Sequence, residues 1–202
     1  ARTLHNLSIN DDNKVAIAKA GGIAPLVALA RDGTDGQKEW AAWTLHNLAA
    51  NADNRVAIAR VGGIAPLVAL ARDGTDGQKE WAARTLHNLA MNADNQVSIA
   101  REGGIAPLVA LARGGTDGQK EQAAGALRWL AFNADNQVAI AEAGGIAPLV
   151  ALARDGTDWQ KVHAARVLRS LALNSENQVA IASAGGIAPL VALACDGTDW
   201  QK

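Results

Sequence analysis

A proline recurs every 41 residues along this chain, each time inside the same block, Gly-Gly-Ile-Ala-Pro-Leu-Val-Ala-Leu-Ala. The prolines are Pro25, Pro66, Pro107, Pro148 and Pro189. Self-similarity at a period of this length indicates stacked units that bury their apolar faces against one another. The sequence therefore predicts one elongated array rather than a globule with a single central core.

A recurrent asparagine marks the start of each repeat and divides the chain. We expect the end of a partial repeat at 1–9 and a truncated repeat at 174–202. The complete repeats are expected at 10–50, 51–91, 92–132 and 133–173. Because both ends then fall within a repeat, we expect either head-to-tail self-association through uncapped ends or an excerpt from a longer array.

Three helices are predicted in each repeat, as the second complete repeat illustrates. Capping residues open the segment 51–61 and two glycines close it, which is typical of a short helix. A second helix, almost wholly apolar, has Pro66 in its first turn. Thr75 and Gln78 have the spacing of a capping box and start a long helix that ends near Met91. The predicted fold is all-α, a right-handed α-solenoid of stacked three-helix repeats.

The long helix has two contrasting faces. On a wheel of about 100° per residue, one side collects the residues that we expect to be buried: Ala41, Ala42, Leu45, Leu48 and Ala49. A narrow stripe on the opposite side collects every tryptophan: Trp40, Trp43, Trp81, Trp129, Trp159 and Trp200. If the alanine and leucine face is buried between repeats, the stripe lines the open inner surface of the solenoid. We therefore predict an exposed series of aromatic side chains that serves as a binding surface.

One position of the stripe has a different interpretation. It holds Ile9, Ala50, Met91, Phe132 and Leu173, and we expect these side chains to lean against the next repeat. At the positions of Trp40 and Trp43, contact with a ligand is favoured. Other repeats place Gln, His, Gly or Arg there, exchanges that a close-packed core would resist.

The long helix also carries the pattern Trp-x-x-x-Asn followed by an apolar residue and Ala, as in the segment 43–49. With the three-helix unit, this pattern resembles the armadillo repeat family, of the importin alpha and beta-catenin type. The resemblance implies that an asparagine series holds the backbone of an extended peptide while tryptophans flank its side chains. By position, the asparagine place holds Asn6, Asn47, Asn88, Trp129 and Ser170, and the tryptophan place holds Arg2, Trp43, Arg84, Gly125 and Arg166. With two further tryptophans of the stripe, the predicted peptide-binding residues are Asn6, Asn47, Asn88, Trp40, Trp43, Trp81, Trp129, Arg84, Arg166 and Ser170.

The overall charge does not indicate a class of partner, since the chain has 19 Lys plus Arg and 20 Asp plus Glu. The local charge of the stripe is more informative. It carries Arg2, Arg84 and Arg166, flanked by Arg128 and Arg169 and partly offset by glutamates at the edge of the same face. These arginines disfavour a lysine-rich import signal. We expect a mixed or mildly acidic peptide with aromatic or aliphatic anchors.

No catalytic, cofactor or metal site is predicted. His5, His46 and His87 recur at the repeat interval, but side chains about 10 Å apart on successive layers cannot share one zinc ion. We expect these histidines to be solvated. A single cysteine, Cys195, excludes an internal disulfide, and no long apolar run predicts a membrane span. An intracellular location, cytoplasmic or nuclear, is the expectation.

The predicted function is a non-enzymatic module that binds a peptide or a disordered protein segment. One alternative is a repeat scaffold, duplicated or engineered, that has no specific ligand and self-associates head to tail. A lesser alternative is single-stranded nucleic-acid binding, in which the tryptophans would stack on bases and the arginines would meet phosphates. The near-zero net charge makes this last alternative weaker.

Overall fold

The computed structural model describes residues 1–198, and this part of the chain is all-α, as predicted. It contains fifteen helices and no strand. The chain divides into two compact units, Ala1–Pro107 and Leu108–Lys202. The division falls inside one apolar helix, α9 (Ile105–Gly114).

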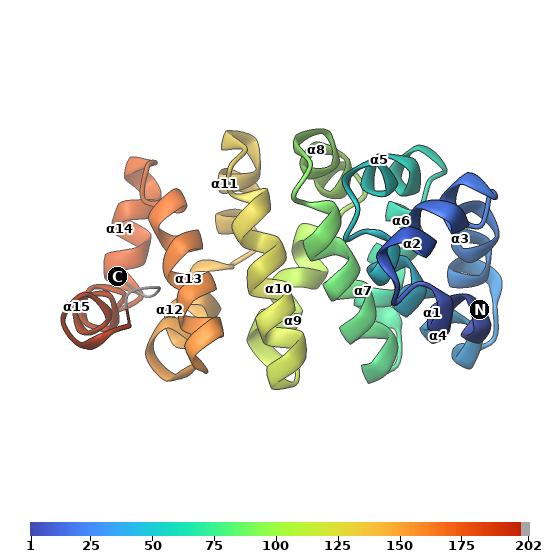
Figure 1. Cartoon of the computed structure of the whole chain (residues 1–202). Helices are drawn as coiled ribbons and strands as arrows, with labels where there is room; N and C mark the ends of the chain where they lie inside the picture. The colour runs from blue at the N-terminus through green and yellow to red at the C-terminus, as the bar shows by residue number, and fades with distance from the viewer. Residues whose placement is uncertain (199–202) are drawn as a thin grey trace. The chain divides into compact units, whose positions relative to one another are not determined.

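Each repeat supplies a short helix, an apolar helix and a long helix (Figure 1). The short helices are α2 (Asp11–Lys19), α5 (Ala52–Arg60), α8 (Ala93–Arg101), α11 (Ala134–Glu142) and α14 (Ser175–Ser183). The apolar helices are α3 (Ile23–Asp32), α6 (Ile64–Asp73), α9, α12 (Ile146–Asp155) and α15 (Ile187–Asp196). The long helices are α1 (Arg2–Leu7), α4 (Asp35–Leu48), α7 (Asp76–Leu89), α10 (Asp117–Leu130) and α13 (Asp158–Leu171).

The recurrent asparagine caps the short helix. In α5, the Asn51 side chain accepts a hydrogen bond of 3.1 Å from the Asn54 N–H, and Asp53 lies in the first turn. The Asn54 amide is 3% exposed and donates hydrogen bonds of 3.1 Å to the backbone oxygens of Leu48 and Lys14. Asn54 therefore joins three segments from two successive repeats.

Two glycines turn the chain between the short and the apolar helix. Gly62 has φ of +75°, a left-handed conformation that glycine adopts without strain. Its N–H donates to the Ala59 oxygen and the Gly63 N–H donates to the Ile58 oxygen, both at 2.9 Å. This pair of bonds is a Schellman motif, which satisfies two carbonyls at the end of α5. The axes of α5 and α6 consequently meet at 86°.

The core consists of the faces that the hydrophobic pattern predicted. In α4, the five residues of the alanine and leucine face are all 0% exposed. In α6, the buried residues are Ile64, Pro66, Leu67, Val68, Leu70 and Ala71.

None of the described helices is long and apolar enough to span a membrane alone. Four bent pairs of successive helices meet the length and composition criteria for a span when each pair is taken together.

The capping box at the start of α7 confirms the predicted role of Thr75 and Gln78. The Thr75 hydroxyl accepts from the Gln78 N–H at 3.3 Å, and the Gln78 side-chain oxygen accepts from the Thr75 N–H at 3.1 Å. The same amide also donates to the backbone oxygen of Asp35, at 3.0 Å, in the preceding repeat. The capping residue thus helps to stack the repeats.

Replacing Gln78 by alanine should therefore destabilise the chain more than the same change at Gln37, which is exposed and makes only the local capping bonds. We expect losses of about 1.5 and about 0.5 kcal/mol, respectively, in the free energy of unfolding. Urea titration followed by circular dichroism measures both. Equal losses would show that the bond from Gln78 to the preceding repeat contributes nothing.

Candidate functional site

The long helices of each unit pack side by side and carry the tryptophan stripe on a common face. In the first unit α4 packs against both α1 and α7, and in the second unit α10 packs against α13 (Figure 1). The apolar helix of the same repeat packs against α4, α7 and α13. This arrangement gathers the predicted binding residues of each unit at one surface.

In the first unit the tryptophans stack on one another. The ring centroids of Trp40 and Trp43 are 5.1 Å apart with planes at 10°, and those of Trp43 and Trp81 are 4.3 Å apart with planes at 13°. All three side chains are half-buried. These three rings are therefore less exposed than predicted, because stacked rings remove much of one another's surface from water.

Arginines flank both ends of this aromatic stack. The Arg2 guanidinium lies 5.5 Å from the centre of the Trp40 ring, and that of Arg84 lies 5.1 Å from the Trp81 ring. Arg84 also forms an ion pair with Glu80, with an N–O distance of 3.0 Å. The positive charge of Arg84 is thus already offset within its own helix, one turn away.

The asparagines of the first unit use their amide nitrogens to bind the preceding repeat. The Asn47 Nδ2 donates to the Ser8 hydroxyl at 3.0 Å and lies 3.4 Å from the His5 ring nitrogen. The Asn88 Nδ2 lies 3.2 Å from His46 Nδ1 and donates to the His46 backbone oxygen at 3.3 Å. The amide oxygens of Asn47 and Asn88 accept no hydrogen bond from the described residues. They are the available part of each asparagine, whereas Asn6 in α1 is exposed as a whole.

The histidines are not solvated, which corrects the sequence prediction. His5 is 5% exposed, and His46 of α4 is half-buried against α7. Burial lowers the pKa of His46 to about 4, and the nearby charge of Arg84 contributes, against the opposing effect of a hydrogen bond with the Arg84 backbone. His163 is also buried and lies 6.3 Å from the exposed Trp159 ring. Residues 1–198 contain no group of three His, Cys, Asp or Glu side chains that could hold a metal ion.

In the described part of the second unit, residues 108–198, no tryptophan stacks on a tryptophan of another repeat. Trp129 occupies the asparagine place of α10 and is half-buried, with the Arg128 guanidinium 4.8 Å from its ring centre. Gly125 and Arg166 occupy the tryptophan place, and Gly125 is buried. The Ser170 hydroxyl donates to the Arg166 backbone oxygen at 3.2 Å. Trp200, the last residue of the predicted stripe, lies outside the described residues.

The position that was expected to lean against the next repeat is exposed instead. The exposed fractions are 67% for Ile9, 40% for Met91, 61% for Phe132 and 78% for Leu173. The reason is that the long helix ends two residues earlier, as at Leu130 in α10, so these residues lie in the turn that leads to the next capping asparagine. They add apolar surface beside the stripe.

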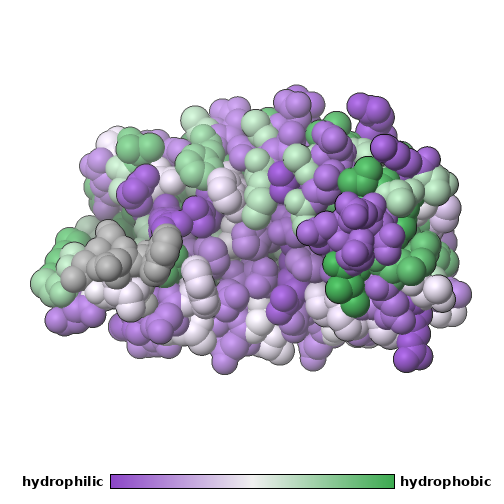
Figure 2. All heavy atoms as spheres, viewed as in Figure 1, coloured by the Kyte–Doolittle hydropathy of each residue, from purple (hydrophilic) through white to green (hydrophobic). Residues whose placement is uncertain are grey.

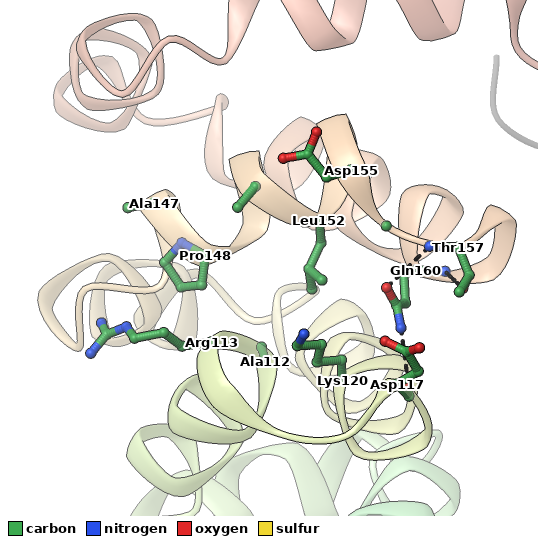
Figure 3. Close-up of a pocket in the computed structure, with 12 residues that line it drawn as sticks. Ala112, Arg113, Asp117, Lys120, Ala147, Pro148, Leu152, Asp155, Thr157 and Gln160 are labelled. Carbon is green, nitrogen blue, oxygen red and sulfur yellow. Dashed lines mark hydrogen bonds between the residues drawn. The ribbon is translucent and has the colours of Figure 1, made fainter.

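A cavity of the second unit lies away from the stripe, among residues of α9, α10, α12 and the start of α13. It measures about 650 Å³, and Pro148 and Leu152 form one wall while Lys120 and Asp155 stand at its rim (Figure 3). Gln160 donates to the Asp117 backbone oxygen at 2.9 Å beside it. A cavity of about 290 Å³ at the equivalent place in the first unit shows that this feature comes from the stacking of apolar helices. Sequence analysis did not predict it.

The helices define the class of protein: an α-solenoid of three-helix repeats whose long helices carry the tryptophan stripe. The family model of the Armadillo/beta-catenin-like repeat matches residues 10–50, and that unit recurs along the chain. The match identifies the segment 10–50 as an armadillo-type repeat, and the fold resembles that of armadillo repeat solenoids. Comparison with curated proteins gave no match.

Solved structures of engineered proteins share the fold. A computationally designed armadillo repeat protein for modular peptide recognition is 25% identical, with a TM-score of 0.91 over 99% of this chain and 87% of that one. Another engineered protein is 29% identical, with a TM-score of 0.91 over 99% and 83%. A designed armadillo repeat protein in complex with the peptide (KR)4 is 24% identical, with a TM-score of 0.87 over 98% and 85%.

Proposed function

We propose that the chain is a non-enzymatic module that binds an extended peptide along the stripe of its long helices. The observation that carries this proposal is the pairing, in the first unit, of available amide oxygens with a stack of half-buried tryptophans. An extended peptide has backbone N–H groups that need acceptors and side chains that need apolar surface. The solved relatives described for peptide recognition support the same function.

The hydrogen bonds of Asn47 suggest how the backbone is held. Its oxygen accepts a peptide N–H, while its nitrogen stays bound to Ser8 and His5. The amide is therefore fixed in one orientation before the peptide arrives, which reduces the entropy lost on binding. Apolar peptide side chains would lie against Trp43 and Trp81. A mixed or mildly acidic sequence with such anchors remains the proposed preference.

The test is selection of a displayed random-peptide library, followed by titration of tryptophan fluorescence with an enriched peptide. The variant with both Asn47→Ala and Trp43→Ala should bind at least about ten-fold more weakly, because it loses a backbone hydrogen bond and an aromatic contact. Ser98→Ala, which restores the alanine of the other repeats, is the matched control and should bind normally. Circular dichroism establishes that each variant is folded. Failure to enrich any peptide with a folded chain would favour a scaffold without a specific ligand.

A second candidate is self-association, which the apolar surface of α15 favours. Ile187 and Val191 are 61% and 55% exposed, whereas their counterparts Ile146 and Val150 in α12 are buried. Burial of such a surface against a second copy is favourable by about 25 cal/mol per Å². We expect the mass measured by light scattering to rise with concentration, and replacement of both residues by Gln to abolish the rise. A constant monomer mass at high concentration would contradict self-association.

A further inference from the structure

Three arginines of the second unit border one small cavity. The cavity measures about 200 Å³ and is lined by Arg128 of α10, by Arg166, Arg169 and Ser170 of α13, and by Phe132. It lies on the face that carries the stripe, and the surface over these two helices is mostly hydrophilic (Figure 2). The second unit thus has a cavity whose lining carries three positively charged side chains.

None of these three arginines forms an ion pair with a carboxylate in the described part of the second unit. The ion pairs of residues 1–198 involve Lys14, Arg31, Arg72, Arg84 and Arg154, and none of the three arginines at the cavity. Arg128 lies over the Trp129 ring, and its pKa is lowered by burial and by the positive charge of Arg166. Like charges held this close repel one another, so an anion placed among them would be stabilised.

At the equivalent position of the first unit, the arginine does form an ion pair with a carboxylate. Arg84 corresponds to Arg166, two repeats earlier, and pairs with Glu80 one turn before it. In α13 the position of that glutamate is occupied by Val162, which is buried. The substitution of one residue therefore leaves Arg166 without the partner that Arg84 has.

We propose that this arginine cluster binds the phosphorylated side chain of a peptide, and that Phe132 contacts an apolar residue beside it. The inference rests on the proposed peptide-binding function and names the chemistry of one part of the ligand. A phosphoryl group carries about −1.5 to −2 charges and three acceptor oxygens. Guanidinium groups donate in planar pairs that match such oxygens. A carboxylate offers one charge and two oxygens, so it satisfies three arginines less well.

The test compares three pools of short fluorescent peptides, in which a central phosphoserine, glutamate or serine is flanked by random residues. Fluorescence anisotropy should show that the phosphoserine pool binds at least about ten-fold more tightly than the serine pool, with glutamate between them. Arg166→Gln should remove this preference. Arg154→Gln is the matched control and should keep it, because Arg154 is paired with Asp155 and does not line the cavity. Thermal unfolding of Arg166→Gln should occur at a temperature no lower than that of the wild type, since the change removes repulsion.

The other outcomes separate this inference from the proposed function. Equal binding of all three pools would overturn the phosphoryl site and leave peptide binding standing, whereas no binding of any pool would overturn both. Inorganic phosphate that quenches Trp129 fluorescence in an Arg166-dependent way, without a preference among the pools, would reduce the cluster to a site for free anions. Tighter binding of a single-stranded oligonucleotide than of the phosphoserine pool, lost in Arg166→Gln, would replace the peptide by nucleic acid.

Discussion

Lowering the pH from 7 to 4 is expected to destabilise the first unit by about 3 kcal/mol through His46 alone. In the folded chain the pKa of His46 is about 4, because burial disfavours the charged ring. In the unfolded chain it returns to 6.5, its value in water. Below pH 6.5 the unfolded chain therefore binds a proton that the folded chain refuses. The stability that His46 contributes is complete above pH 6.5 and is lost as the pH falls to about 4.

Besides burial, which is the main cause, the hydrogen bond with Asn88 disfavours protonation of His46 in the folded chain. His46 Nδ1 faces the Asn88 amide nitrogen at 3.2 Å and acts as an acceptor only while it carries no hydrogen. Protonation would place two donors against each other, near the positive charges of Arg84 and Lys14. Acid therefore weakens the joint between two repeats at the residue that the proposal assigns to peptide binding.

Urea titrations at pH 7 and at pH 4.5, on the wild type and on His46→Gln, measure this effect. Glutamine keeps an acceptor near Asn88 but does not titrate, so the variant should lose less stability between the two pH values. Titration of the carboxylates affects both proteins alike. The same loss in both proteins would exclude His46 as the source.

Replacing Gly63 by alanine is expected to reduce the free energy of unfolding by about 2 to 3 kcal/mol. A Cβ atom at this position would lie 2.6 Å from Ile58 Cγ2 and 2.8 Å from the Ile58 backbone oxygen. It would also lie 3.1 Å from Val27 Cγ2 of the preceding repeat. The backbone oxygen cannot move away without breaking the Schellman bond that ends α5.

Gly36→Ala provides the matched comparison for this change. A Cβ atom there meets nothing within 4 Å, and Gly36 lies in the first turn of α4. Alanine should therefore stabilise the chain by about 0.5 kcal/mol, since it favours the helix and restricts the unfolded chain. Thermal unfolding of the two variants should shift in opposite directions. A loss at Gly63 no larger than a few tenths of a kcal/mol would show that the turn tolerates a side chain.

The sequence predicted the fold well because its signals are local. The repeated proline block, the two glycines and the Thr75 to Gln78 spacing each act within a few residues of the helix end that they determine. A wheel drawn for one helix correctly found the buried face of α4. These features do not depend on how the next repeat is placed.

The interactions of the candidate site were harder to predict because they join residues that are far apart in the sequence. The bond between His46 and Asn88 spans 42 positions, and the stacking of Trp43 on Trp81 likewise crosses a repeat boundary. A single-helix wheel gives the direction of each side chain but not the neighbour that it meets. The difference between Arg84 and Arg166, in contrast, is visible in the sequence, since Glu80 and Val162 stand one turn before them.

The buried asparagine of the short helix has a consequence for how such chains can be rearranged. The side-chain amides of Asn54 and Asn95 donate to backbone oxygens of their neighbours, at Leu48 and Lys14 in one case and at Leu89 and Arg55 in the other. Every residue type provides a backbone oxygen, so this junction requires no particular side chain from the adjoining segment. Repeats with different recognition residues can therefore be shuffled, deleted or inserted while the same joint is formed each time.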